Sequence, residues 1–187
     1  HFAKNGEDAH VIAKMNSLLD KGIIEKLYEA SQAGVKIELI VRGICVLIPG
    51  IPGISDNITV RSIVGRFLEH SRIFWFRNGG REELYISSAD WMPRNLNDRV
   101  ELMVPIEDPE IKRRLKQMVD IELSDNQKAH IMQADGTWLK TISAENQLCA
   151  QEYFQKIAEK RDAEDELTLA QKLEPYTPVL GHGDGSD

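Results

Sequence analysis

Two apolar runs with a helical segment between them constrain the fold of this chain most strongly. Residues 10–16 and 36–41 are short and rich in apolar side chains, which predicts strands, and the apolar residues between them recur at helical spacing. Asp20 suits the cap at the start of this helix, and Gly34 suits the position just after its end. A strand, a helix and a strand with short connections form a βαβ unit, in which the two strands run parallel. The sequence therefore predicts an α/β fold.

The later strand and helix signals make the predicted sheet a mixed one. Strands are expected at residues 71–76, 83–87 and 99–104, a short helix at 61–69, a helix from Pro109 to about Glu122, a hairpin of 129–134 with 137–142, and a final helix capped by Ser143 that runs to about Lys160. Asn78-Gly79 is a strong signal for a tight turn between antiparallel strands. Residues 49–57 contain two prolines and two glycines, which favours a shaped loop, and they lack the Walker A pattern. We expect a domain at residues 1–160 and an acidic tail at 161–187 that frays.

Composition argues against several classes of protein. The cysteines, Cys45 and Cys149, form no CxxC pattern, so we expect reduced and inert thiols rather than disulfides or a zinc site. No apolar run approaches the roughly 20 residues of a transmembrane helix. The net charge is +1 over residues 1–100 and -8 over 101–187, so no nucleic-acid partner is expected. Because the chain starts at His1 without a methionine, we expect a fragment of a larger enzyme.

The basic side chains of the first part of the chain are uniform in type. Between Lys36 and Lys112 every basic residue is an arginine, namely Arg42, Arg61, Arg66, Arg72, Arg77, Arg81, Arg94 and Arg99. The planar guanidinium holds phosphate or carboxylate oxygens in pairs. Any one of these arginines is better explained by solvation or a structural ion pair, but eight together favour an anion site.

The candidate site residues lie where predicted strands begin or end. Ligands of open α/β sheets bind beyond the carboxyl ends of the strands, and Arg42 lies at such an end. His70 precedes a later strand, and Arg72 is placed to share its face. Ser87 and Ser88 end the next strand and offer hydroxyl and N–H groups to an anion, although an ordinary polar turn is the alternative. Such a set can hold a phosphoryl group while the histidine attacks phosphorus or protonates the leaving oxygen.

Six segments of the chain resemble the histidine-dependent polyphosphate kinases. They are residues 13–18 (AKMNSL), 30–37 (ASQAGVKI), 41–45 (VRGIC), 49–53 (PGIPG), 61–72 (RSIVGRFLEHSR) and 87–96 (SSADWMPRNL). The resemblance covers roughly residues 9–157 and is dense from 30 to 105. It implies the C-terminal catalytic subdomain of that family, one of two phospholipase D-like halves, with a mixed sheet flanked by helices and a C-terminal hairpin and helix.

The resemblance also implies a reaction. The family moves the terminal phosphate of ATP reversibly onto inorganic polyphosphate through a phosphohistidine. Arg42 matches the family's arginine for the nucleotide phosphates, and His70 matches its second histidine, which contacts ATP and is a candidate proton donor. The phosphorylated histidine and the Mg²⁺-binding arginines belong to the preceding subdomain, which matches nothing in this chain. We therefore expect this chain alone to be inactive as a kinase.

The same resemblance implies partners and a location. It implies ATP, ADP and polyphosphate as substrates, contacts with the preceding subdomains of the same enzyme, and a homo-oligomer. It places the complete enzyme in the cytoplasm, either free or at the periphery of the inner membrane.

Two other functions stay open. The chain could be mainly a docking and assembly module, since a fragment has to cover the face meant for its missing half. A phosphodiesterase of the phospholipase D type is the weaker alternative. The phospholipase D pattern is HxK followed by GSxxN. In this chain Arg72 replaces the lysine, Ser87 replaces the glycine and Trp91 replaces the asparagine, and these departures argue against hydrolysis of lipid or nucleic-acid phosphodiesters.

Overall fold

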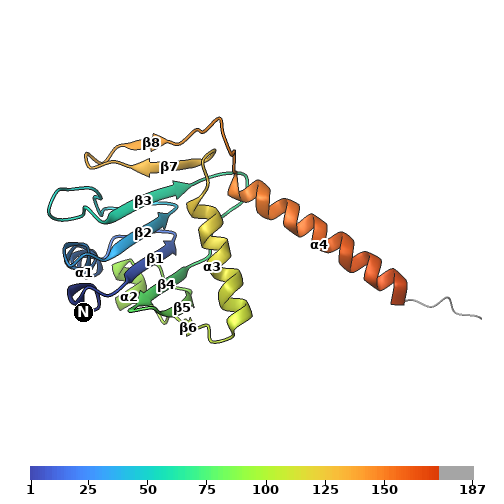
Figure 1. The fold of residues 1–187 in the computed structure, drawn as a ribbon, viewed down its shortest axis with the longest axis horizontal. Coiled ribbons are helices and arrows are strands. Elements are labelled where there is room, and N and C mark those ends of the chain that lie inside the picture. The colour runs from blue at the N-terminus through green and yellow to red at the C-terminus, as the bar shows by residue number, and fades with distance from the viewer. Residues whose placement is uncertain (173–187) are drawn as a thin grey trace, which may run out of the picture. The chain divides into compact units, whose positions relative to one another are not determined.

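The computed structural model describes the backbone of residues 1–172 and the side chains of residues 1–162. Eight strands form one mixed sheet in the order β6-β5-β4-β1-β2-β3-β7-β8 (Figure 1). They are β1 (Ala9–Met15), β2 (Lys36–Val41), β3 (Ile58–Ile63), β4 (Ile73–Asn78), β5 (Arg81–Ser87), β6 (Met103–Pro105), β7 (Ala129–Met132) and β8 (Trp138–Lys140). The α-helices are α1 (Lys21–Gln32), α2 (Pro93–Asn97), α3 (Pro109–Leu123) and α4 (Ala150–Lys172).

The predicted βαβ unit is confirmed. Strands β1 and β2 pair in parallel, and α1 connects them. The carboxylate of Asp20 accepts a hydrogen bond from the N–H of Ile23 at 2.9 Å, as expected for the N-cap. Gly34 has φ +95°, a left-handed conformation that glycine adopts without a steric penalty. The local signals in the sequence therefore define both ends of α1.

Helices α1 and α3 cover opposite faces of the sheet. Alternate residues of a strand point to opposite faces, so Ile12 and Ala13 of β1 enter different cores. Ala13 lies in the core that also contains Leu27 of α1. Ile12 lies in the second core, which Val119 of α3 helps to fill. A shift of one residue in the pairing of β1 would exchange these faces, so the burial pattern fixes its register.

Two element predictions were wrong. Residues 61–69 do not form a helix, because Ile58–Ile63 form β3, which pairs in parallel with β2. Ile58 and Val60 are buried and Thr59 is exposed, which is the alternation of a strand. The final helix is not capped by Ser143, whose hydroxyl instead bonds to the backbone of Glu145.

A distant carboxylate serves the start of α4 instead of a local cap. Asp125 is buried, and its Oδ2 accepts a hydrogen bond from the N–H of Ala150, the first residue of α4, at 2.8 Å. Its Oδ1 accepts from the N–H groups of Gln127, Lys128 and Ala129. One side chain therefore orders both the turn into β7 and the first turn of α4.

The hairpin predictions are confirmed with small shifts. Strands β4 and β5 are antiparallel, and the turn consists of Gly79 and Gly80, both with positive φ, with Asn78 paired to Arg81. Strands β7 and β8 pair as predicted. The strand predicted at 99–104 is shorter and lies at Met103–Pro105.

The chain divides into two compact units, residues 1–151 and 152–187. The sheet and helices α1 to α3 belong to the first unit. Helix α4 continues to Lys172, and residues 173–187 of the expected tail lie outside the described residues. The expected extent of the domain, residues 1–160, stays a prediction.

Candidate functional site

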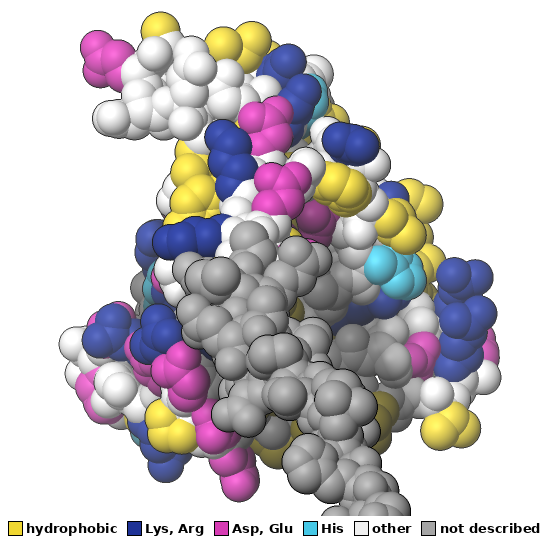
Figure 2. Space-filling view, turned by 90° about the vertical axis from the view of Figure 1, so that its right-hand side faces the viewer, with side chains coloured by type: hydrophobic (Ala, Val, Ile, Leu, Met, Phe, Trp, Pro, Cys, Tyr) yellow, Lys and Arg dark blue, Asp and Glu magenta, His cyan; other side chains and the backbone are white. Residues whose placement is uncertain are grey.

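The sheet topology brings the candidate residues to one edge. Strands β1 and β2 are parallel, so Arg42 follows β2 beside the end of β1. Strand β4 is antiparallel to β1, so His70 and Arg72 precede β4 at that same edge, at the right of Figure 1. Strand β5 returns to the edge and ends at Ser87. Figure 2 looks onto this side of the molecule, where basic, acidic and hydrophobic side chains are interspersed.

Hydrogen bonds connect the end of β2 to the segment after β5. Arg42 donates from Nε to Oδ1 of Asn16 at 2.7 Å. The backbone N–H of Asn16 donates to Oδ1 of Asp90, also at 2.7 Å. Among the described residues, no hydrogen bond or ion pair involves the two Nη groups of Arg42, which leaves these donors for a ligand.

Asp90 holds Arg72 in a paired interaction. Nε and Nη2 of Arg72 donate to the two carboxylate oxygens of Asp90 at 2.9 and 3.0 Å. The Asp90 side chain is only 5% exposed, and that burial pushes its pKa upward. The hydrogen bonds from Arg72 and from the Asn16 N–H outweigh burial and keep the pKa of Asp90 below its usual value. Asp90 therefore stays ionised as the fixed partner of a cation.

Arg72 in turn holds His70. Its Nη1 donates to the backbone oxygen of His70 at 2.9 Å and lies 3.0 Å from the ring Nδ1. Its Nη2 lies 3.3 Å from the ring Nε2. Arginine only donates, and a neutral imidazole has one acceptor nitrogen, so the ring accepts one of these two contacts. The imidazole itself is exposed at the edge of the sheet.

Ser87 and Ser88 lie at the same edge, but their hydroxyls already have partners. Oγ of Ser87 donates to the carbonyl of Leu102 and accepts from the N–H of Ala89, both at 3.0 Å. Oγ of Ser88 accepts from the N–H of Leu102 at 3.0 Å and donates to the carboxylate of Glu101. The serine pair thus joins the end of β5 to the segment before β6. Its role as an anion ligand stays a prediction.

An open hollow of about 450 Å³ adjoins Arg42. Its walls include Cys45, Ser62, His130 and Trp138. Burial raises the pKa of the Cys45 thiol to about 11, which fits the expected inert thiol. Arginine Nη groups at the mouth of a hollow suit the oxygens of a phosphate chain.

Neither a metal cluster nor a membrane-spanning helix occurs in the part of the chain that the structure describes. Within it, no group of three or more His, Cys, Asp or Glu side chains could hold a metal ion. Within the same residues, no helix is both long and apolar enough to cross a membrane. The position of the expected magnesium site stays a prediction.

Sequence comparison identifies the family. The family model described as polyphosphate kinase C-terminal domain 2 matches residues 1–151. The chain belongs to this family. It is 54% identical over 146 residues to a polyphosphate kinase of Pseudomonas putida, an alignment that covers 78% of the chain and 20% of that protein. The chain thus spans about a fifth of such relatives, and it is homologous to the C-terminal part of polyphosphate kinase.

Solved structures support the family and the fold. The crystal structure of polyphosphate kinase from Porphyromonas gingivalis superposes with a TM-score of 0.81 at 42% identity, over 86% of this chain and 25% of that one. Nuc from Salmonella typhimurium, a phospholipase D family member, superposes with a TM-score of 0.51 at 12% identity, over 70% of this chain and 86% of that one. The second likeness concerns the fold alone, and it confirms the predicted phospholipase D-like mixed sheet.

Sequence reasoning missed two members of the site. Asn16 stands at the carboxyl end of the strand predicted at residues 10–16, and Asp90 stands in the segment 87–96 that carries the family resemblance, but neither was assigned to the site. Asp90 could have been recognised from its position just after a predicted strand and a pair of serines, as a carboxylate in a region where the basic residues are arginines and need acidic partners. The segment before β4 is also ordered by Lys14, which stands near the carboxyl end of that same predicted strand, and by Gln151, and both lie far from the segment in the sequence.

Proposed function

We propose that this chain is the C-terminal part of a polyphosphate kinase that reversibly transfers the terminal phosphate of ATP to inorganic polyphosphate. The phosphohistidine forms on the preceding part of the complete enzyme, which also supplies the Mg²⁺ ligands. The observation that carries this proposal is the connected set at the sheet edge, in which Asn16 and Asp90 link Arg42 to Arg72 and His70. The family membership of the chain supports the same reaction.

In this proposal Arg42 binds phosphate directly. Its Nε is fixed by Asn16, so the guanidinium is oriented before a ligand arrives, and its two Nη groups donate to phosphate oxygens as a planar fork. Pre-orientation lowers the entropy cost of binding. Positive charge at this point also stabilises the negative charge on the oxygens of the transferring group.

In this proposal His70 contacts the phosphate, or its ring first takes up a proton on the nitrogen that accepts from Arg72 and then gives a proton to the leaving oxygen. Its exposed ring can approach a ligand, and Arg72 fixes the ring through the backbone oxygen and a ring nitrogen. Because three of the Arg72 nitrogens already bond to Asp90 and His70, we assign Arg72 chiefly to orienting His70. Ser87 and Ser88 hold the loop that carries Asp90. The backbone N–H of Ser87 also donates a hydrogen bond to the backbone carbonyl of Arg72 at 3.1 Å.

An assembly role is the second candidate, and exposed apolar side chains favour it. Val64, Phe67 and Leu68 are 59, 45 and 71% exposed in the segment before β4, and Val100 is fully exposed before β6. Large apolar side chains grouped on a surface mark interaction sites. In the complete enzyme the preceding subdomains would cover them, so this role accompanies the kinase function.

Exchanging the arginine fork for a lysine tests the proposal. In the complete enzyme, Arg42→Lys keeps the charge but loses the paired donors, at a cost of about 1.5 to 3 kcal/mol. We expect kcat/KM for ATP in polyphosphate synthesis to fall by a factor of about 10 to 150. Arg81→Lys, at an exposed arginine in the β4–β5 hairpin, is the matched control and should leave the rate unchanged. Equal rates for Arg42→Lys and the unmodified enzyme would contradict the proposal.

A further inference from the structure

The segment that carries His70 belongs to no strand or helix. Residues 64–72 connect β3 to β4, and most of their side chains are exposed. The ring of His70 contacts Arg72, so its position also depends on how firmly the preceding backbone is held. Three contacts hold that backbone, and the partners in two of them come from elements far away in the sequence.

In the first contact, the side-chain amide of Gln151 forms two hydrogen bonds with the backbone of Phe67, as a neighbouring strand would. Gln151 accepts from the N–H of Phe67 at 2.9 Å and donates to the carbonyl of Phe67 at 2.8 Å. Its side chain is buried, and a Cβ at Gly65 would collide with its Oε1, so any other residue at position 65 would displace the Gln151 amide. The same Nε2 of Gln151 lies 3.2 Å from Oε1 of Glu69.

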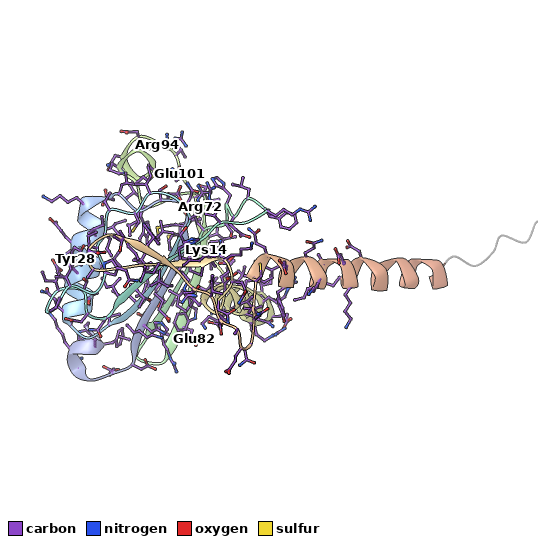
Figure 3. The ribbon with its side chains drawn as sticks, turned by 90° about the horizontal axis from the view of Figure 1, so that it is seen from above. Lys14, Tyr28, Arg72, Glu82, Arg94 and Glu101 are labelled. Carbon is purple, nitrogen blue, oxygen red and sulfur yellow. The ribbon has the colours of Figure 1, made fainter. Side chains whose placement is uncertain are left out.

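The second contact is an ion pair of Glu69, the residue just before His70. Oε2 of Glu69 lies 3.3 Å from Nζ of Lys14, on β1. Lys14 is 3% exposed, and its Nζ also lies 3.2 Å from Oε1 of Glu122, on α3. A buried ammonium group requires nearby carboxylates, because an unpaired charge in the interior is strongly unfavourable. Lys14 therefore fixes Glu69 firmly. Figure 3 shows Lys14 and Arg72 at the same end of the sheet.

The third contact is the bond from Arg72 to the carbonyl of His70. The carboxylate of Glu69 is thus held from two sides, because one oxygen accepts a hydrogen bond from Gln151 and the other forms an ion pair with Lys14. No such link is visible in the sequence, because the partners are 55 and 82 residues away from Glu69.

We propose that Glu69 is a positioning residue that, through Lys14 and Gln151, holds His70 against Arg72 for phosphate transfer. The inference rests on the proposed function and adds a residue to it. Glu69 contacts no reacting atom in this scheme. It restricts the backbone of the segment, so that the imidazole is already in place when Arg42 binds the phosphate chain.

The test uses Glu69→Ala and Glu69→Gln in the complete enzyme, with Glu82→Ala, an exposed glutamate of β5, as the matched control. Because Arg42 still binds phosphate, we expect Glu69→Ala to lower kcat about 10- to 100-fold while KM for ATP changes less than about twofold. Glu69→Gln keeps the shape and one acceptor, so it should recover part of kcat. The control should match the unmodified enzyme.

Amide hydrogen exchange provides a readout that does not depend on activity. The N–H of Phe67 should exchange at least about tenfold faster in Glu69→Ala than in the control, while amides of β1 stay protected. Unchanged exchange, or unchanged kcat despite faster exchange, would overturn the positioning role. Absence of polymer synthesis by the unmodified enzyme would instead contradict the proposed function, and the exchange rates would still decide whether Glu69 orders the segment.

Discussion

Replacing Glu122 by glutamine should raise the free energy of unfolding, relative to that of the unmodified chain, as the pH rises. The carboxyl of Glu122 is buried between the sheet and α3, and its Oε2 has no hydrogen-bond partner. Burial raises the pKa of Glu122 to about 7, Lys14 opposes this rise, and Glu69 adds to it. The Glu122 backbone carbonyl also faces Arg61, at 3.4 Å from Nη1.

The sign and size of the effect follow from the two protonation states. Below pH 4.5 the carboxyl is protonated in both the folded and the unfolded chain. Between pH 4.5 and about 7 it keeps its proton only in the folded chain, so rising pH favours unfolding. The stabilising contribution present at low pH is lost as the pH rises through about 7. At about 1.4 kcal/mol per pKa unit, the folded state loses about 2.5 kcal/mol between pH 5 and pH 8.

Urea denaturation at pH 5 and pH 8 measures this loss. Glu122→Gln cannot titrate, so its free energy of unfolding relative to the unmodified chain should rise by about 2.5 kcal/mol over that interval, about 1 M in urea midpoint. Glu110→Gln makes the same chemical change on the exposed start of α3. A hydrogen bond from Arg113 keeps the pKa of Glu110 low, so the effect of this control should be constant. Parallel pH profiles for Glu122→Gln and the unmodified chain would refute the reasoning.

Three further outcomes are expected. Asp90→Asn breaks a buried charge pair, so urea denaturation at pH 7 should show a free energy of unfolding lower by about 3 kcal/mol. This loss should shrink as the pH falls below about 4, because aspartate in the unfolded chain then becomes protonated. An unchanged urea midpoint would contradict the role of Asp90. Asp125→Ala leaves four backbone N–H groups without their acceptor and should destabilise the chain by about 2 to 4 kcal/mol. The amide of Ala150 should then exchange faster. Protection of this amide equal to that in the unmodified chain would argue against the role of Asp125. Purified residues 1–187 incubated with ATP and Mg²⁺ should make no polyphosphate, and robust synthesis would show that no other part of the enzyme is needed.

The part of the fold that depends on local signals could be predicted. The βαβ unit follows from apolar periodicity and from a cap at Asp20, three residues from its hydrogen-bond partner. Arg42 and His70 could be assigned to one edge of the sheet, because parallel strands and a hairpin leave few alternatives. The predicted helix at 61–69 failed because pairing with β2 outweighs the weak helical pattern of those residues.

The contacts that build the site could not be predicted, because each joins distant residues. Asn16 and Asp90 are 74 residues apart, and Phe67 and Gln151 are 84 apart. Ser143 looked like a cap because serine often serves that role, but Asp125 lies 25 residues before Ala150 and takes its N–H instead. Spacing along a sequence carries no information about such partners.

Locating the phosphate that the complete enzyme takes from ATP distinguishes a contact role of His70 from covalent phosphorylation. Enzyme carrying His70→Ala would be incubated with ATP, digested under conditions that preserve phosphohistidine, and mapped by mass spectrometry beside the unmodified enzyme. Polymer synthesis by His70→Ala should be largely lost, while a histidine outside this chain still carries phosphate. Phosphate on His70 of the unmodified enzyme, with none on any histidine of the preceding part, would contradict the contact role of His70.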